Sequence, residues 1–233
     1  MTNIRHNRIY ENPNDIHAKT LLTSLLESNI PAKKYQKNMY DIGVHLGNKL
    51  KNTLDKNKTF CIVSTAEDAD FLAKGILESL EKDIPAIYLT CFWNDRISVN
   101  GSNVAPIYNK YFESGYKKSD ELIVVKSIIS GSCVVKTNVT ALIDTITPKA
   151  IHVVSPVMHV DSDAKLEKEF PLSISKLFKY IFLAKDSEFL KNGEMVPGIG
   201  GSIYEKLGFK NQQDKNTFIP EIVKRKMFSR SHH

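Results

Sequence analysis

A strand–helix–strand pattern in the first half of the chain places the strongest limit on its fold. Phe60-Cys61-Ile62-Val63 is a short, continuously apolar run, which is typical of a strand that is buried on both faces. A helical pattern follows from Ala66 to Leu80, and residues 85–92 form a second strand-like run. Two such strands joined by a helix lie parallel in one sheet. The pattern therefore predicts an α/β fold with a mostly parallel sheet flanked by helices.

The same alternation extends along the rest of the chain. Apolar residues at helical spacing predict two helices between Asp15 and about Asn52, divided at Pro31, which we place at the start of the second helix. Further strands are expected at 121–125, 151–157 and 178–184, with helices from 133 to about 146 and from 164 to 170. We therefore predict a single domain over residues 1–228.

Residues 93–118 interrupt this pattern. The segment is polar and irregular, and Asn-Gly-Ser-Asn occupies positions 100–103, which favours a turn. It also carries aromatic residues at Tyr108, Tyr111, Phe112 and Tyr116. We predict a hairpin or flap that stands apart from the sheet.

A glycine- and proline-rich segment at 192–201 is a candidate ligand loop. Pro197 fixes its own φ, and glycines such as Gly198 and Gly200 allow a close approach of the backbone. Such a loop can offer N–H and C=O groups to a flat polar ligand, for which a nucleobase is one candidate. A plain surface connection has the same composition, so both interpretations remain open.

A turn of small residues, Ser130-Gly131-Ser132-Cys133, joins the third strand to the following helix. The N–H groups of such a turn lie at the positive end of the helix dipole and can bind a phosphate. Ser132 could equally be an ordinary helix cap. Cys133 is either a reactive thiol at the helix start or a small buried residue.

Composition excludes few functions. The formal net charge of +6 is compatible with a phosphate-bearing partner, but the lysines are spread along the chain, so nucleic acid is an unlikely partner supported by charge alone. The chain contains three cysteines without metal-type spacing, Cys61, Cys91 and Cys133, which predicts reduced thiols. We predict no protein-bound metal site.

The chain also lacks sequence signals for a membrane. No apolar run approaches the roughly 20 residues that span a bilayer, and the first six residues lack the apolar core of a signal peptide. We expect a cytoplasmic protein without membrane partners. Residues 229–233 end in two histidines that are typical of the start of a purification tag, and we exclude them from functional reasoning.

In the order of its elements the chain resembles the uracil phosphoribosyltransferases, enzymes of the type I phosphoribosyltransferase fold that make UMP from uracil and 5-phosphoribosyl diphosphate. The resemblance covers about Asp15 to Phe209 and is strongest from Ala184 to Gly200, where Val196-Pro197-Gly198-Ile199-Gly200 is similar to the family's Val-Pro-Gly-Leu-Gly. It implies a type I phosphoribosyltransferase-like α/β fold with a small flap at about 93–118 and a hood at about 184–210.

Two departures from the family pattern bear on catalysis. The family ends its loop strand in an aspartate that orders the metal-bound substrate, and here that stretch begins Val125-Lys126. The family's arginine that meets the diphosphate falls near Thr65 to Glu67, so an acidic group stands where the family has a cation. Losing one such contact typically costs about 2 to 4 kcal/mol in the transition state.

The resemblance nevertheless implies two groups of site residues. The phosphate and phosphoribosyl group would contact the loop between the third strand and its helix: Lys126, Ser130, Gly131, Ser132 and Cys133. The base would contact the hood: Met195, Val196, Gly198, Gly200 and Gly201. Lys126 would replace the lost cation near the diphosphate, and the catalytic residues stay unassigned.

Two functional classes follow from the resemblance. The first is a diverged uracil-type phosphoribosyltransferase with weak activity and the family's Mg²⁺ requirement. The second is a catalytically silent relative that binds a nucleotide, or a protein partner, and acts as a regulator. In either case a homodimer or higher homo-oligomer is favoured, because members of the family generally associate and because the flap carries an aromatic run.

Overall fold

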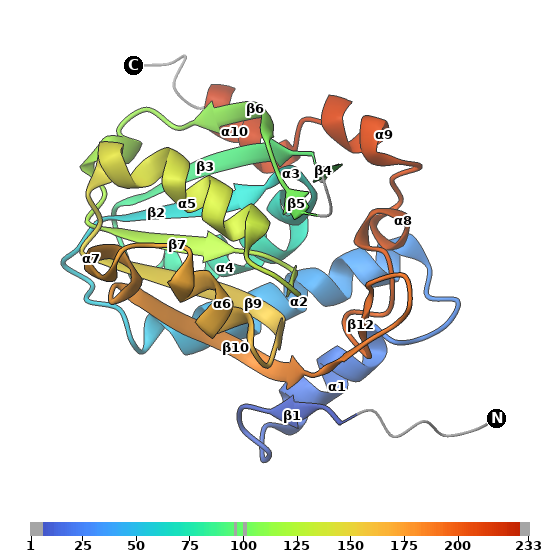
Figure 1. Ribbon diagram of the computed structural model, residues 1–233. Helices are drawn as coiled ribbons and strands as arrows, with labels where there is room; N and C mark the ends of the chain where they lie inside the picture. Colours follow the sequence, from blue (N-terminus) through green and yellow to red (C-terminus); the bar gives the residue numbers. More distant parts are fainter. Residues whose placement is uncertain (1–6, 96, 100–101, 229–233) are drawn as a thin grey trace.

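The computed structural model describes residues 7–95, 97–99 and 102–228 (Figure 1). Its main sheet has parallel interior strands and an antiparallel strand at each edge. In spatial order the strands are β1 (Ile9–Tyr10), β10 (Phe178–Asp186), β9 (Ala150–His159), β7 (Glu121–Val125), β2 (Phe60–Thr65), β3 (Ile87–Asn94) and β6 (Ile107–Phe112), with β8 (Ile128–Ile129) beside β9. The predicted α/β class with a mostly parallel sheet is confirmed.

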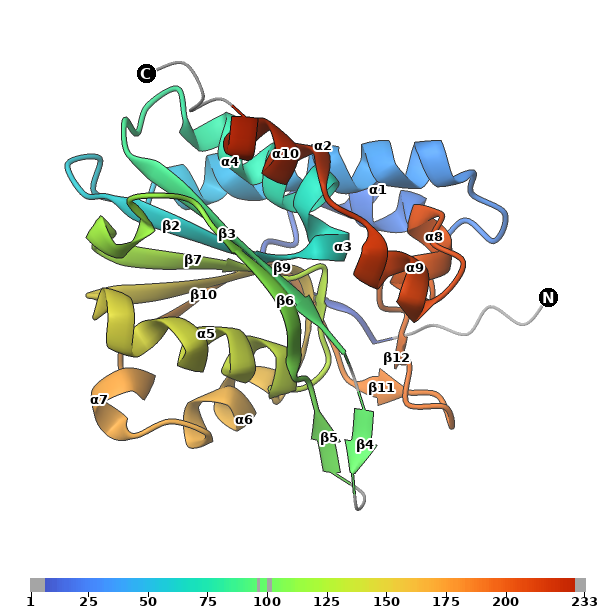
Figure 2. The same ribbon diagram turned by 90° about the horizontal axis from the view of Figure 1, so that it is seen from above.

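Helices cover both faces of this sheet, which explains why its central strands are mostly apolar. Every residue of β2, β7 and β9 is buried. Figure 2 shows one layer of helices above the sheet and another below it. The first layer contains α1 (Ile16–Ser24), α2 (Ala32–Lys51), α3 (Ala66–Asp68), α4 (Lys74–Leu80) and α10 (Glu221–Phe228); the second contains α5 (Cys133–Ile146), α6 (Ser162–Lys168) and α7 (Leu172–Ser175).

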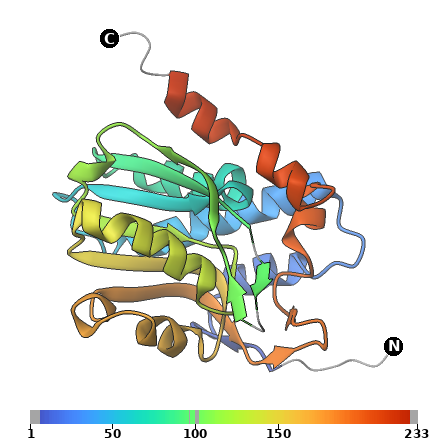
Figure 3. The ribbon, with the colours of Figure 1, turned by 45° about the horizontal axis from the view of Figure 1, so that its top comes forward.

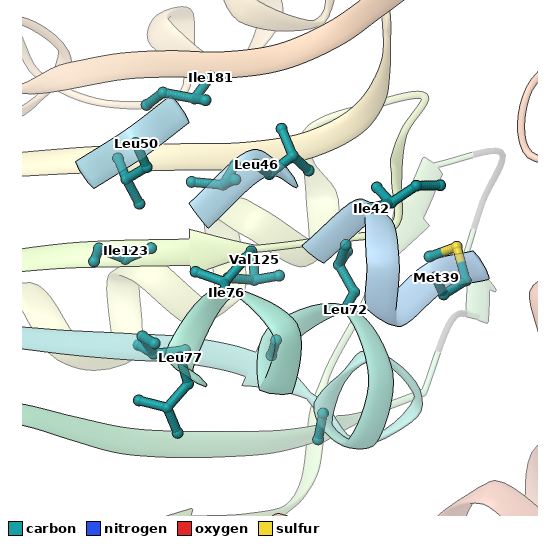
Figure 4. Packing of buried hydrophobic residues seen from close by; sticks show 14 of the residues in the cluster. Met39, Ile42, Leu46, Leu50, Leu72, Ile76, Leu77, Ile123, Val125 and Ile181 are labelled. Carbon is teal, nitrogen blue, oxygen red and sulfur yellow. The ribbon is translucent and has the colours of Figure 1, made fainter. Parts of the chain in front are cut away.

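Helix α2 supplies the apolar stripe that closes the first layer over the sheet. Its residues Met39, Ile42, Leu46 and Leu50 are at most 1% exposed and face the strands together with residues of α4 (Figure 4). The division at Pro31 is confirmed, with Pro31 as the residue that caps α2. Asp15 caps α1, because its carboxylate accepts a hydrogen bond from the N–H of Ala18 at 2.8 Å.

Glycines allow α2 and α4 to touch at the backbone. A Cβ added to Gly43 would lie 2.3 Å from the carbonyl oxygen of Leu72, and one added to Gly75 would lie 2.3 Å from the carbonyl oxygen of Tyr40. Carbonyl oxygens of helices cannot move aside as a side chain can. The two helices are therefore held at a distance that only glycine permits.

The helix expected over 66–80 is interrupted. A π-helical turn, Ala69–Ala73, separates α3 from α4. Such turns arise where one residue too many is fitted into a helix, and they change which side chains face the preceding loop. Here Glu67 and Asp68 before the turn are buried at the end of β2.

The flap is smaller than predicted. Only β4 (Ile97–Val99) and β5 (Ser102–Val104) form a projecting hairpin, and β6 instead joins the main sheet antiparallel to β3 (Figure 2). Part of the predicted turn at 100–103 lies outside the described residues, and residues 229–233 lie outside them entirely. Residues 107–112 lack the continuous apolar run of a buried strand. They form an edge strand, which exposes polar side chains to solvent.

Most of the flap's aromatic rings pack on their own domain. Phe112 stacks on Tyr116 with ring centroids 4.7 Å apart and meets Phe92 edge-on, and Tyr111 packs against the opposite core. Of these rings Tyr108 alone is strongly exposed, at 68%. The rings at 111, 112 and 116 stay half-buried in the single chain, so the dimer contact through the aromatic run stays a prediction, as does the homo-oligomer.

The carboxyl-terminal part closes one end of the sheet. The hood contains a small hairpin of β11 (Glu188–Phe189) and β12 (Met195–Val196), followed by α8 (Ile203–Leu207). The chain then continues through α9 (Gln212–Thr217) to α10, along the path that Figure 3 shows. No helix in the described ranges is long and apolar enough to cross a membrane.

A Gly43→Ala substitution should destabilise the protein by about 1 to 3 kcal/mol. Alanine is the better helix former by about 1 kcal/mol, but here the added methyl would overlap the Leu72 carbonyl, and overpacking outweighs propensity. Urea denaturation measures the free energy of unfolding. Gly131→Ala is the control because a Cβ there meets nothing within 4 Å, and equal stability of the two variants would contradict the predicted helix contact.

A buried His152 should make the protein less stable below neutral pH. Burial lowers the pKa of His152, although its hydrogen bond with Glu121 at 2.7 Å opposes this. Because the unfolded state then binds the proton more readily, stability is lost as pH falls through about 6.5, the usual pKa of histidine. Between pH 7.5 and 5.5 the wild type should lose about 1 kcal/mol more than His152→Gln, measured by urea denaturation. Parallel pH profiles for the two proteins would refute this role.

Candidate functional site

Three loops converge at the carboxyl end of the sheet. Residues that follow β2, residues that follow β7 and residues of the hood line a common cavity of about 270 Å³. Parallel strands place their carboxyl ends at one edge, which is the usual ligand site of such sheets. The lining residues are Glu67, Lys126, Ile128, Ser130, Asn192–Met195, Ile199 and Gly201–Tyr204.

The floor of the cavity carries a buried ionic cluster. Lys126, 5% exposed, places its Nζ 2.5 Å from Oδ2 of Asp68 and 3.2 Å from Oε1 of Glu67. Oδ2 of Asp68 also accepts from Thr65 Oγ1 at 2.9 Å. Burial opposes the ionisation of Glu67, but Lys126 and then Lys215 outweigh it, so the pKa of Glu67 is lowered. The cluster therefore holds charged groups that neutralise one another.

This cluster changes the role expected of Lys126. We expected its ammonium to replace the family's cation beside a diphosphate. It instead lies between the carboxylates of Glu67 and Asp68. A cation that is already paired twice attracts an incoming diphosphate weakly, because the carboxylates repel the same ligand.

The hood is fixed from beneath by the first residues of the described chain. Arg8 donates two hydrogen bonds to Asp186, at 2.9 and 2.7 Å, and a third at 2.5 Å to the carbonyl oxygen of Gly198. The N–H of Gly198 donates to Asp186 at 2.9 Å. Tyr35, from α2, donates to the carbonyl oxygen of Ile199 at 2.9 Å. The hood backbone is thus held by the protein's own side chains.

Only part of the predicted base-binding loop faces the cavity. Met195 and Gly201 line it. Val196 pairs with Glu188 in the hood hairpin, and the backbone groups of Gly198 bond to Asp186 and Arg8. Gly200 adopts φ +85°, and a Cβ there would lie 2.1 Å from the Leu25 carbonyl oxygen. Neither Gly198 nor Gly200 lines the cavity, and their contact with a base stays a prediction.

The far side of the cavity is held by the segment after the hood. Trp93 donates its indole N–H to the carbonyl oxygen of Phe218 at 2.8 Å, and Lys215, fully buried, donates to that of Asn94 at 2.5 Å. These bonds tie α9 to the end of β3. Tyr204, whose ring lies 5.7 Å from the Lys215 ammonium, is thereby placed at the cavity wall.

A wider depression of about 910 Å³ adjoins the cavity. It contains the predicted phosphate-loop residues Ser130, Gly131, Ser132 and Cys133 at the start of α5. Ser132 caps α5 without a side-chain hydrogen bond to its backbone and instead donates to Glu169 at 3.2 Å. Ser130, Asn192 and Gly193 line both hollows, so the two spaces are neighbours.

Two lysines that line this depression were not predicted from the sequence as site residues. Lys165 and Lys168, exposed on α6, line it opposite the start of α5. Lys165 lies 3.8 Å from Asp161, and Glu169 beside them pairs with Lys136. No motif marks Lys165 and Lys168, since exposed lysines are common on helices. Only the fold reveals that they share a hollow with residues 130–133.

The described residues do not supply a magnesium site. No group of three or more histidine, cysteine, aspartate or glutamate side chains that could hold a metal occurs in the described ranges. Of the two carboxylates that line the cavity, Glu67 and Glu194, the first already binds the ammonium group of Lys126. Mg²⁺ remains an expectation of the resemblance alone, and we assign it no step.

The three cysteines are free thiols, as the sequence predicted. Cys61 and Cys91 are buried, and burial raises the pKa of both, that of Cys61 to about 12. Cys133 is half-buried in the wider depression.

Comparison with known proteins supports the fold and identifies neither a ligand nor an activity. No protein-family model matches the chain, and no curated protein matches it in sequence. Among solved structures, the AQ2163 protein from Aquifex aeolicus matches with a TM-score of 0.67 at 14% identity, over 83% of this chain and 95% of that one.

Two weaker matches are a hypothetical protein from Neisseria gonorrhoeae with bound ppGpp and a hypoxanthine phosphoribosyltransferase from Staphylococcus aureus. The first has a TM-score of 0.42 at 13% identity, over 62% of this chain and 77% of that one. The second has a TM-score of 0.41 at 13% identity, over 66% and 76%. Neither likeness is close enough to carry an argument about ligand or activity. The chain is thus similar in fold to these proteins, and none of the three is described as a uracil enzyme.

Proposed function

We propose that this protein binds a nucleotide, with the 5′-phosphate at the start of α5 and the base in the cavity under the hood. The observation that carries the proposal is the junction of two unlike hollows at Ser130, Asn192 and Gly193. One hollow is basic and lies at a helix amino terminus, and the other is small and partly apolar. A nucleotide has the same two halves, joined by a ribose.

The phosphate half rests on three kinds of donor. The helix α5 has 14 residues, so its dipole and free N–H groups favour an anion at Ser130–Cys133. The hydroxyl of Ser130 can donate a hydrogen bond, whereas that of Ser132 donates to Glu169. Lys165 and Lys168 add positive charge from the opposite wall.

The base half rests on the walls of the cavity. Ile128, Met195, Ile199 and Ile203 contribute apolar surface, and Tyr204 contributes a ring that can contact a flat ligand. A volume of about 270 Å³ is modest for a ligand pocket and suits a ligand of nucleobase size.

Phosphoribosyl transfer to a pyrimidine base giving UMP is the second candidate. It is favoured by the sequence resemblance at 184–200, because this segment forms the hood over the cavity. Against efficient transfer stands the ionic cluster, in which the carboxylates of Glu67 and Asp68 take up the ammonium of Lys126. A silent regulatory relative fits this cluster better than an enzyme of ordinary efficiency.

Removing both lysines of the depression should weaken phosphate binding. Lys165→Ala/Lys168→Ala is expected to lower the affinity for ribose 5-phosphate by about three- to thirtyfold, since exposed charge contacts contribute roughly 0.3 to 1 kcal/mol each. Isothermal titration calorimetry at fixed ionic strength measures the change. The control, Lys117→Ala/Lys118→Ala, removes the same charge from an exposed turn outside both hollows. Equal affinities of the two variants, or no binding by the wild type, would refute the proposal.

The protein should form UMP at a rate well below that of ordinary enzymes. Turnover with uracil, 5-phosphoribosyl diphosphate and Mg²⁺ is expected at least a hundredfold below about 1 per second, because the cation for the diphosphate is missing. A coupled UMP-formation assay measures this rate. Turnover in the range of about 1 to 10³ per second would show that the ionic cluster opens when substrate binds, and would favour phosphoribosyl transfer as the function.

A further inference from the structure

An aromatic platform forms part of the wall of the wider depression. Phe189, in β11, is 45% exposed and lines the depression. The imidazole of His159, at the end of β9, stacks on it with ring centroids 4.7 Å apart and an interplanar angle of 28°. His159 is buried, and its Nδ1 accepts a hydrogen bond from the N–H of Asp161 at 3.1 Å. The imidazole therefore supports the phenyl ring from one side, and the exposed part of the ring faces the depression.

The depression has more room than the phosphate of the proposed nucleotide needs. Its volume of about 910 Å³ is more than three times the volume of the adjoining cavity, about 270 Å³, which suits a base. A phosphate group is only a few times larger than a water molecule, whose share of liquid volume is about 30 Å³. With one phosphate at the start of α5, the space beside Phe189 is open to a further group of the same ligand.

The hood hairpin places this platform next to the base cavity. Phe189 of β11 lies directly opposite Met195 of β12. Side chains that are directly opposite in an antiparallel pair share one face of the sheet, with Cβ atoms about 4.5 to 5.5 Å apart. Met195 lines the cavity, and Phe189 lines the depression. A single ligand can therefore contact both side chains from one face of the hairpin.

The charges of the depression suit more than one phosphate. Lys165 and Lys168, exposed on α6, both line it. Glu169 is the one carboxylate among the described lining residues, and it already pairs with Lys136. The start of α5 adds the partial positive charge of a helix amino terminus. The surplus of positive charge attracts a diphosphate more strongly than a single phosphate.

We infer that the depression holds a second nucleobase, stacked on Phe189, and that the ligand class is a dinucleotide in which a diphosphate joins two nucleosides. The inference deepens the proposed function and rests on it, because it takes the first base to lie in the cavity and a phosphate to lie at the start of α5. Every nucleobase has a flat π-face, so stacking on an aromatic ring contributes affinity for any base. Phe189 therefore strengthens binding of the second nucleoside without selecting its base.

Isothermal titration calorimetry of the whole chain tests this inference with three series of ligands, built on adenosine, guanosine and uridine. Each series contains the 5′-monophosphate, the 5′-diphosphate and the dinucleoside 5′,5′-diphosphate. The 5′-diphosphate shows the effect of the second phosphate alone, and the dinucleotide adds the second nucleoside. In at least one series the dinucleotide should bind about five- to a hundredfold more tightly than the 5′-diphosphate, the range typical of a base stacked on an aromatic side chain.

Variants of the platform identify where the second nucleoside binds. Phe189→Ala should abolish the advantage of the dinucleotide and leave the affinity for ribose 5-phosphate within about twofold. Phe189→Tyr should retain the advantage, because it keeps the ring. The control is Leu190→Ala, which removes a neighbouring side chain that is also exposed but lines neither hollow, and it should leave every affinity unchanged. An advantage that persists in Phe189→Ala would overturn the inference.

The outcomes also separate this inference from the function on which it rests. If ribose 5-phosphate or a mononucleotide binds, but no dinucleotide binds more than about threefold more tightly than its 5′-diphosphate, the second base site is wrong and nucleotide binding stands. If none of these ligands binds, both are wrong. The wild-type comparison decides between these outcomes even if Phe189→Ala, checked by thermal unfolding, fails to fold.

Discussion

The buried cluster of Lys126, Glu67 and Asp68 is the constraint on which the site depends. Charges removed from water are stable only when they are paired, and deleting one partner of a buried pair typically costs about 3 to 5 kcal/mol. The cluster therefore joins the loop after β2 to the loop after β7 as firmly as packing could. The width of the cavity floor and the polarity of its edge are both set by this pairing.

The same cluster reverses the charges that the family resemblance leads one to expect. The family pattern has a cation after the strand equivalent to β2 and a carboxylate after the strand equivalent to β7. This chain has carboxylates after β2 and a lysine after β7. The lysine of one loop still pairs with the carboxylates of the other, but the order of the charges along the chain is inverted.

The sequence predicted the sheet well and the site in part, for physical reasons. Strands such as β2 and β7 are continuously apolar because helices cover both faces, and a short apolar run between polar turns is typical of such a strand. The edge strand β6 was missed because an exposed edge has the polar composition of a loop. The surroundings of Gly198 and Gly200 could not be predicted, because a sequence shows that a glycine has freedom, but not whether its open side faces a ligand or, like Gly200, the Leu25 carbonyl. Lys165 and Lys168 became visible only when α6 was placed beside the start of α5.

The hydrogen bonds from Arg8 to Asp186 and Gly198 join segments of the chain that the ribosome synthesises at different times. Arg8 and Asp186 are separated by 178 residues, and β1 pairs with β10. At a typical synthesis rate of about 5 to 20 residues per second, Arg8 waits roughly 10 to 35 seconds before Asp186 has been made. Strands β2 and β3 are much closer in sequence, so they can pair earlier. The hood can therefore acquire its final shape only after two segments that are synthesised 178 residues apart have met.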